Sequence, residues 1–280
     1  MRKTLFRTTL SAVCLAAIPG LALAGDNCTH SAPRSLQLDL AGVKTLRVET
    51  NQHDVRLRAA PGGSHAISGR ACASKAQWLQ DLTVTQERRG DTLVVRARRE
   101  EAGGLSTLWG DNYAWLELSG TVPDNMRVQL VVGSGDGELD GAASASADVG
   151  SGDAKLRGIR GPVTAKVGSG DIGIDGAGTL EVLSVGSGDV KARNVGGNVK
   201  VGSIGSGDFE LSGARGDVHI GSIGSGDADL SGVTGAVRID SIGSGDAEVR
   251  GAASLSVGSI GSGGVRHRDV GGRVDLPRDN

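Results

Sequence analysis

Seven aspartates recur along the sequence at a nearly fixed spacing, each ending a Gly-Ser-Gly-Asp tetrapeptide. The first copy begins at Gly133, and successive aspartates lie 17 to 19 residues apart. They are Asp136, Asp153, Asp171, Asp189, Asp208, Asp227 and Asp246; an eighth copy, 261–264, ends in glycine. In a stacked repeat these carboxylates would form a file with neighbours about 5 Å apart, where like charges in water repel by roughly 0.8 kcal/mol per pair. A bound divalent cation could relieve that repulsion.

Two interpretations of these aspartates are open. Calcium takes six to eight oxygen ligands, and calcium-binding β-rolls supply them from repeats of about nine residues. Here the second half of a unit carries no such motif; after Asp208 it reads Asp217-Val218-His219-Ile220, a strand pattern. We therefore favour aspartates that accept hydrogen bonds from backbone N–H groups of their own turns. A cation ladder is the alternative, and we expect no cofactor.

The residues between the aspartates predict the elements that position them. In the unit 208–226, apolar side chains alternate with polar ones at Phe209 and Leu211 and again at Val218 and Ile220. Alternation with period two indicates strands with one buried face. A Gly-rich turn, 212–216, separates the two strands, and we expect the Gly-Ser-Gly segment to turn the chain through positive φ angles. Neighbouring units repeat the same columns, which is typical of a stacked solenoid.

The predicted fold is therefore all-β: a single-stranded parallel β-helix, or β-solenoid, with about 18–19 residues per rung. Inward positions do not recur every six residues, as they do in left-handed hexapeptide helices, and parallel crossovers are overwhelmingly right-handed. The pattern thus favours a right-handed helix. We divide the chain into a signal peptide (1–24), N-terminal irregular β rungs or a cap (25–124), the solenoid (125–276) and a tail (277–280).

The N-terminus has the pattern of a secretory signal. Basic residues precede an apolar stretch, 10–18, and Ala22-Leu23-Ala24 forms an A-x-A cleavage site. Cleavage there would remove Cys14 and leave Cys28 and Cys72, and a pair of cysteines in an exported chain indicates a disulfide. No segment has the 18 or more uninterrupted apolar residues of a membrane span. We expect an exported protein, located in the periplasm, at the cell surface or in the medium.

Three aromatic residues, Trp109, Tyr113 and Trp115, lie in or beside a Gly-rich stretch before the repeats. Trp109 and Trp115 could plug the end of the rod, which we favour, or the three aromatic residues could stack on a glycan. A helical turn is possible at 76–79. Enzymatic activity is not expected, because units of 17 to 19 residues leave no long loops for a catalytic cleft. The histidines, His30, His53, His65, His219 and His267, stand in no nucleophile or metal motif.

Charge is unevenly distributed along a chain whose formal net charge is −2. Residues 34–100 contain twelve Lys/Arg against seven Asp/Glu, whereas residues 133–264 contain ten against seventeen. An acidic rod argues against a nucleic-acid partner, because phosphate binding requires a basic stripe. The basic N-terminal portion is interpreted as a solvated strand face, with contact to anionic envelope polymers as the alternative.

The repeat resembles a known family. Gly-Ser-Gly-Asp, a short apolar strand, a Gly turn and a Val-x-Val strand are similar to the bacterial putative-adhesin β-strand-repeat domains of unknown function, which are related to the head-GIN domain of auto-transporter adhesins. The resemblance extends over roughly Leu36 to Leu276, including Trp115-Leu116-Glu117-Leu118 and Val122-Pro123-Asp124. It implies a β-helix in the cell envelope.

The function expected from these observations is a non-enzymatic structural or adhesin-like interaction module. Its partner would be an envelope protein or a surface polymer, which the sequence does not identify. The alternative is a binding module, for a divalent cation along the aspartates or for a glycan at the aromatic residues.

Overall fold

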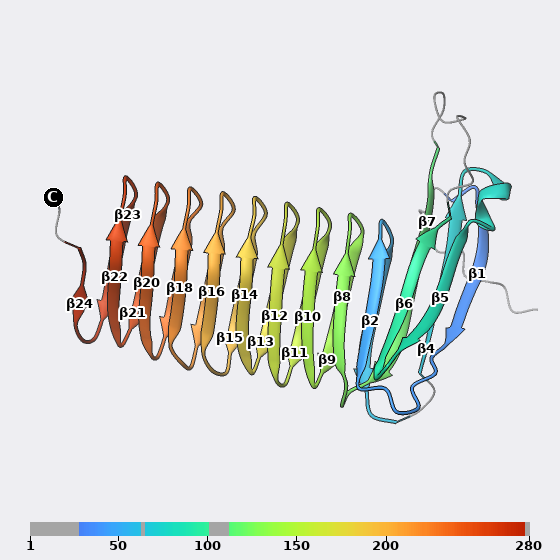
Figure 1. Cartoon of the computed structure of the whole chain (residues 1–280), viewed down its shortest axis with the longest axis horizontal. Coiled ribbons are helices and arrows are strands. Elements are labelled where there is room, and N and C mark those ends of the chain that lie inside the picture. The colour runs from blue at the N-terminus through green and yellow to red at the C-terminus, as the bar shows by residue number, and fades with distance from the viewer. Residues whose placement is uncertain (1–27, 63–64, 101–111, 278–280) are drawn as a thin grey trace, which may run out of the picture.

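The computed structural model describes residues 28–62, 65–100 and 112–277, which form a β-solenoid of about eight turns, as expected from the repeat. Two parallel sheets face each other along the rod, and each rung contributes one strand to each sheet (Figure 1). Following the rungs in Figure 1, near strands rise while the chain advances and far strands descend, so the coil is right-handed.

Sheet A contains the aspartate file. In spatial order its strands are β1 (His30–Gln37), β4 (Ala66–Ala73), β7 (Ala114–Pro123), β3 (Asp54–Ala60), β9 (Asp136–Ala142), β11 (Asp153–Ile159), β13 (Asp171–Ala177), β15 (Val190–Val195), β17 (Phe209–Ala214), β19 (Ala228–Val233), β21 (Asp246–Ala252) and β23 (Gly264–Val270).

Sheet B forms the opposite wall. Its strands, in spatial order, are β24 (Val274–Asp275), β22 (Ser254–Ile260), β20 (Ala236–Ile242), β18 (Val218–Ile223), β16 (Val199–Ile204), β14 (Thr179–Val185), β12 (Pro162–Val167), β10 (Ser144–Val149), β8 (Arg127–Val132), β2 (Thr45–Asn51), β6 (Thr92–Arg99) and β5 (Leu82–Arg89). The one helical segment among the described residues is the 3-10 turn η1 (Ala76–Leu79), at the place where a helical turn was considered.

The inward columns are those that alternation predicts. Phe209 and Leu211 are fully buried, as are Val218 and Ile220 on the opposite wall. Each stacks on its counterpart in the next rung, for example Leu211 on Leu230. The core is therefore one narrow aliphatic column running the length of the rod, since adjacent rungs are about 4.8 Å apart.

The Gly-Ser-Gly turns use glycine for a different reason than we expected. Their glycines do not have positive φ. Instead, a Cβ on the third residue of the motif would lie against the carbonyl oxygen of the same residue one rung earlier, at 1.7 Å for Gly170 and 1.8 Å for Gly207. No side chain fits there, so glycine is required because the stacked turns approach so closely.

Positive φ occurs instead at the next-to-last residue of several sheet A strands, just before the other turn of the rung. Gly158, Gly176 and Gly213 have φ between 61° and 85°, and Asn194 takes the same place in its rung with φ 58°. Asparagine is one of the few residues other than glycine that visit this region readily. The end of the sheet A strand thus requires a residue that tolerates positive φ, whereas the Gly-Ser-Gly turn requires the absence of a side chain.

The N-terminal end of the rod is not built in chain order. The rung made by β2 and β3 lies directly against β8 and β9, and the later strands β6 and β7 lie outside it. Antiparallel strands then close the end: β5 pairs with β6, and β4 pairs with β7 and β1. Trp78 of η1 is buried in the core at this end, with Lys75 and Arg99 over its ring at 4.6 and 4.8 Å.

The disulfide expected between Cys28 and Cys72 is present. It ties the segment before β1 to β4, the next strand of sheet A. The predicted signal peptide and Cys14 lie outside the described residues. Across the residues that the structure describes, there is no helix of the length and apolarity that a membrane crossing requires.

Candidate functional site

The aspartate file lies on the outer side of sheet A, where its strands begin. Asp153 is in register with Asp136 on one side and Asp171 on the other. We expected the carboxylates to accept hydrogen bonds from their own turns, and this prediction is wrong. Instead the Oδ1 atom of five of them accepts the backbone N–H of the next aspartate in the file, at 3.0 Å from Asp208 to Asp189 and 2.9 Å from Asp227 to Asp208. Asp136 is an exception, because the N–H of Asp153 donates to the carbonyl oxygen of Gly135 at 3.3 Å.

The same bond joins Asp171 to Asp153, Asp189 to Asp171 and Asp246 to Asp227, at 2.8 to 3.2 Å. Each of these five carboxylates therefore links two rungs. The file has one member that was not predicted, Asp54, whose Oδ1 accepts the N–H of Asp136 at 2.9 Å. Asp54 follows no Gly-Ser-Gly and lies 82 residues earlier, so only its position before the alternating strand 55–57 could have indicated it.

These bonds make the aspartates structural side chains. Among the described residues, no cluster of three or more His, Cys, Asp or Glu is arranged to hold a metal ion. Beside the file, Glu210, Asp229 and Glu248 form a second acidic column. Partial burial, together with the nearby Glu248 carboxylate, raises the pKa of Asp229.

The aromatic residues proposed as a glycan site make internal contacts. The Tyr113 hydroxyl bonds Thr29 at both its backbone N–H (2.9 Å) and its Oγ1 (2.7 Å). Trp115 lies on β7 next to buried Leu116, and the guanidinium of Arg70 sits 5.5 Å from its ring centroid. These contacts fix the N-terminal strands, while the residue that enters the core there is Trp78. Trp109 lies outside the described residues.

The histidines have separate environments. His219 points outward as predicted, and its Nε2 lies 2.8 Å from Asp240 Oδ2. His267 stands in register with buried Val249 but is exposed, because β23 is the last strand of sheet A described. His53 is buried, its Nδ1 accepts the N–H of Leu116 at 3.2 Å, and burial lowers its pKa to about 4.

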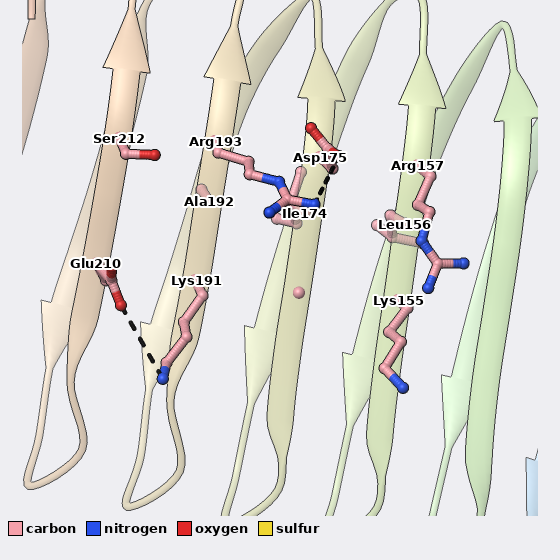
Figure 2. A pocket seen from close by; sticks show the side chains of 11 residues that line it. Lys155, Leu156, Arg157, Ile174, Asp175, Lys191, Ala192, Arg193, Glu210 and Ser212 are labelled. Atoms are coloured by element: carbon pink, nitrogen blue, oxygen red, sulfur yellow. Dashed lines mark hydrogen bonds and ion pairs between the residues drawn. The ribbon is translucent and has the colours of Figure 1, made fainter. Parts of the chain in front are cut away.

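A concavity lies on the outer face of sheet A, above Gly173. It has a volume of about 400 Å³. Gly173 is in register between Lys155 of β11 and Lys191 of β15, and it is the only one of the three without a side chain. We call this feature the Gly173 hollow. In Figure 2, Lys155 and Arg157 lie on one side of it, and Lys191 and Arg193 lie on the other.

Ion pairs between rungs surround the Gly173 hollow. Arg193 Nη2 lies 2.9 Å from Asp175 Oδ2, and Lys191 Nζ lies 4.0 Å from Glu210 Oε2 (Figure 2). Arg157 contacts Asp140 at 3.4 Å. The hydrogen bond from Arg193, followed by that from Asn194, lowers the pKa of Asp175. All four cationic side chains remain exposed to solvent.

The hollow was not predicted from the sequence. A sequence signal for it exists. When the repeats are aligned on their aspartates, the column two residues after the aspartate has Gly173 between Lys155 and Lys191. Alternation assigns that column to the outer face but does not indicate what the missing side chain leaves open. The hollow arises where a rung lacks the outward side chain that its neighbours carry.

The fold and its exposed faces define a class: a rigid β-solenoid whose surface is made of flat, charged sheet faces joined by short turns. The sequence model of one family, described as "Putative auto-transporter adhesin, head GIN domain", matches residues 163–268. This match confirms the expected resemblance, and it falls within the Gly-Ser-Gly-Asp repeats, in the part of the rod that contains Gly173. No match was found among curated proteins.

Solved structures show the same fold. A putative adhesin from Parabacteroides distasonis is 13% identical with a TM-score of 0.56, and the alignment covers 85% of this chain and 97% of that one. A putative adhesin from Parabacteroides merdae is also 13% identical with a TM-score of 0.53, covering 86% and 97% respectively. At these identities the likeness concerns the fold alone.

Proposed function

We propose that this protein is an exported, non-enzymatic interaction module of the cell envelope that binds surface material through its flat sheet faces, in the manner of an adhesin. The observation that carries the proposal is the outer face of sheet A, where successive parallel strands present charged side chains in register. The match to an adhesin family supports the same interpretation.

The rigidity of the face favours binding over catalysis. Inter-rung bonds from the aspartates and from the Gly-Ser-Gly backbone hold the outward side chains in fixed columns. Because a rigid surface loses little conformational entropy on contact, it can bind an extended polymer through many weak contacts. The turns between rungs are too short to build the deep cleft in which most enzymes exclude water.

The expected location agrees with this role. An interaction module of the envelope must leave the cytoplasm, and the A-x-A pattern at 22–24 predicts that it does. The disulfide between Cys28 and Cys72 fits an oxidising compartment. We propose the periplasm or the cell surface as its site of action.

Binding of the labelled protein to whole cells and to isolated envelope polymers of the producing bacterium tests this function. We expect saturable binding that falls when charges on one sheet face are reversed and persists when the same number is reversed on the other. Absence of saturable binding to any envelope fraction would refute the proposal.

A further inference from the structure

We propose that the Gly173 hollow binds a carboxylated sugar unit of an anionic polysaccharide, with Lys155 and Lys191 pairing with its carboxylates. This inference rests on the proposed function, because it names the class of surface material that the rod would bind. It requires that the hollow be accessible, cationic and rigid, and that its chemistry suit a sugar better than other polyanions.

Access follows from the absence of a side chain at one position. If Gly173 carried a Cβ, the nearest atom beyond its two chain neighbours would be Lys155 Cγ, at 3.9 Å. The backbone there would accept a side chain, since its φ lies outside the left-handed region. Glycine is thus not required by the fold at this position, in contrast to Gly170 three residues earlier. What it provides is open space above β13.

The cations are held at a fixed spacing around that space. Lys155 and Lys191 are each one strand from Gly173, so their Cα atoms are about 9.6 Å apart across the sheet. Arg157 and Arg193 repeat this arrangement on either side of Asp175. An extended chain crossing the strands would therefore meet Lys155 and Arg157 on β11, then Gly173 beside the Arg193–Asp175 ion pair, then Lys191 on β15 (Figure 2).

The anions near the hollow select among possible ligands. Asp175 and Glu210 line it, and Asp171 lies two residues before Gly173 on the same face of β13. A nucleic acid, with one charge per roughly 1.7 Å of duplex, would be repelled by these carboxylates. A uronic-acid unit carries one carboxylate and several hydroxyls, so it can pair with the lysines and donate hydrogen bonds to the carboxylates. Ser212 adds a hydroxyl at the rim.

The existing ion pairs do not prevent binding. The Lys191–Glu210 pair spans 4.0 Å and the Lys155–Glu138 pair 3.9 Å, and both lysines are more than half exposed. Exposed pairs of this kind contribute at most about 1 kcal/mol. Each lysine can therefore exchange its partner for a ligand carboxylate. Affinity for one sugar segment will be weak and will fall with salt, and repeated attachment along a polymer raises it.

Isothermal titration calorimetry with the intact protein tests the proposal. The probe is an oligosaccharide of four galacturonate units, and the neutral control is cellotetraose. The variants are K155E/K191E, which reverses two charges at the hollow, and G173Q, which fills it without changing charge. The matched control is K166E/K200E, which makes the same charge change at two exposed lysines on the outer face of sheet B. Circular dichroism checks that each variant is folded.

We expect the wild type to bind tetragalacturonate and not cellotetraose. K155E/K191E and G173Q should each weaken binding at least about tenfold, or about 1.4 kcal/mol, and K166E/K200E should change it less than about twofold. Equal weakening by the two double variants would overturn the proposal, because binding would then follow net charge alone. Tighter binding of a polyglutamate peptide or of polyphosphate would overturn it in favour of that ligand. If the wild type binds envelope polymers but not tetragalacturonate, the sugar assignment fails and the proposed function stands.

Discussion

The stacking of the Gly-Ser-Gly turns makes a sharp prediction about two glycines of one rung. Gly170→Ala should destabilise the protein strongly, whereas Gly173→Ala should not. A Cβ at Gly170 would lie 1.7 Å from the carbonyl oxygen of Gly152, and ordinary contact begins at 3.4 Å. The two turns must therefore separate by well over 1 Å. At Gly173 the nearest atom, Lys155 Cγ, is already at 3.9 Å.

The size of the effect follows from the bonds that such a separation would break. Ser169 and Gly170 both donate to the carbonyl of Gly150, at 2.7 and 3.3 Å, and Gly168 donates to Val149 at 2.8 Å. Two or three lost backbone bonds, at about 1 kcal/mol each, give a loss of about 3 kcal/mol. Gly173→Ala should instead stabilise by about 0.5 kcal/mol, because glycine in a strand costs conformational entropy.

Urea unfolding and thermal melts of the purified protein, followed by circular dichroism, measure both variants. For a protein of this size, a loss of about 3 kcal/mol corresponds to a drop in melting temperature of roughly 6–12 °C. Because solenoids can unfold in parts, hydrogen exchange of peptides spanning 150–190 locates the damage. If Gly170→Ala and Gly173→Ala differ by less than about 0.5 kcal/mol, close stacking of the turns is not what requires glycine.

Three further predictions concern single side chains. Asp208→Asn should change stability by less than about 1 kcal/mol with or without millimolar calcium, because the amide oxygen can still accept the N–H of Asp227. If calcium raised the melting temperature of the wild type and not of this variant, the aspartates would form a cation site. Leu211→Asp should cost several kcal/mol of stability, because it buries an unpaired carboxylate. His219→Ala on the outer face should cost less than about 1 kcal/mol. Similar shifts of the two melting temperatures would contradict the assignment of Leu211 to the core and His219 to the surface. The pKa of His53 is about 4 in the folded protein, against an ordinary value of 6.5. The free energy of unfolding should therefore be highest above pH 6.5 and fall by about 3 kcal/mol as the pH drops to 4. His53→Gln should remove that pH dependence, and an unchanged dependence of the unfolding free energy on pH would show that other groups cause it.

The sequence predicted which residues form the core because the same packing problem is solved in every unit. Phe209 and Leu211 could be assigned inward from alternation within one rung, and the assignment was strengthened by every neighbouring rung. The role of the aspartates could not be obtained in the same way. A single unit suggests a bond within its own turn, and the true donor, the N–H of the next aspartate, becomes visible only when the register between rungs is known.

The order of the N-terminal rungs was beyond sequence reasoning for a similar reason. Strands β2 and β3 pair with β8 and β9, more than 70 residues later, while β6 and β7 pass to the outside. Alternation identifies a strand but carries no information about its neighbour. Trp78 illustrates the consequence: the aromatic residue that enters the core was not among those expected to plug the rod, since only the three-dimensional order shows which end it closes.

In a repeat protein, residues that match the repeat pattern indicate the fold. Residues that depart from the pattern are the candidates for a specific role. The eighth motif ends in Gly264, which has no carboxylate to accept a bond from a further rung, and the inward column ends at exposed His267. These two departures lie in the last strand of sheet A that the structure describes. Gly173 is a different kind of departure, because it lies in the middle of the rod, where the stack continues on both sides and the backbone would accept a side chain. Neither termination nor steric need accounts for it, and for that reason we look for a ligand there.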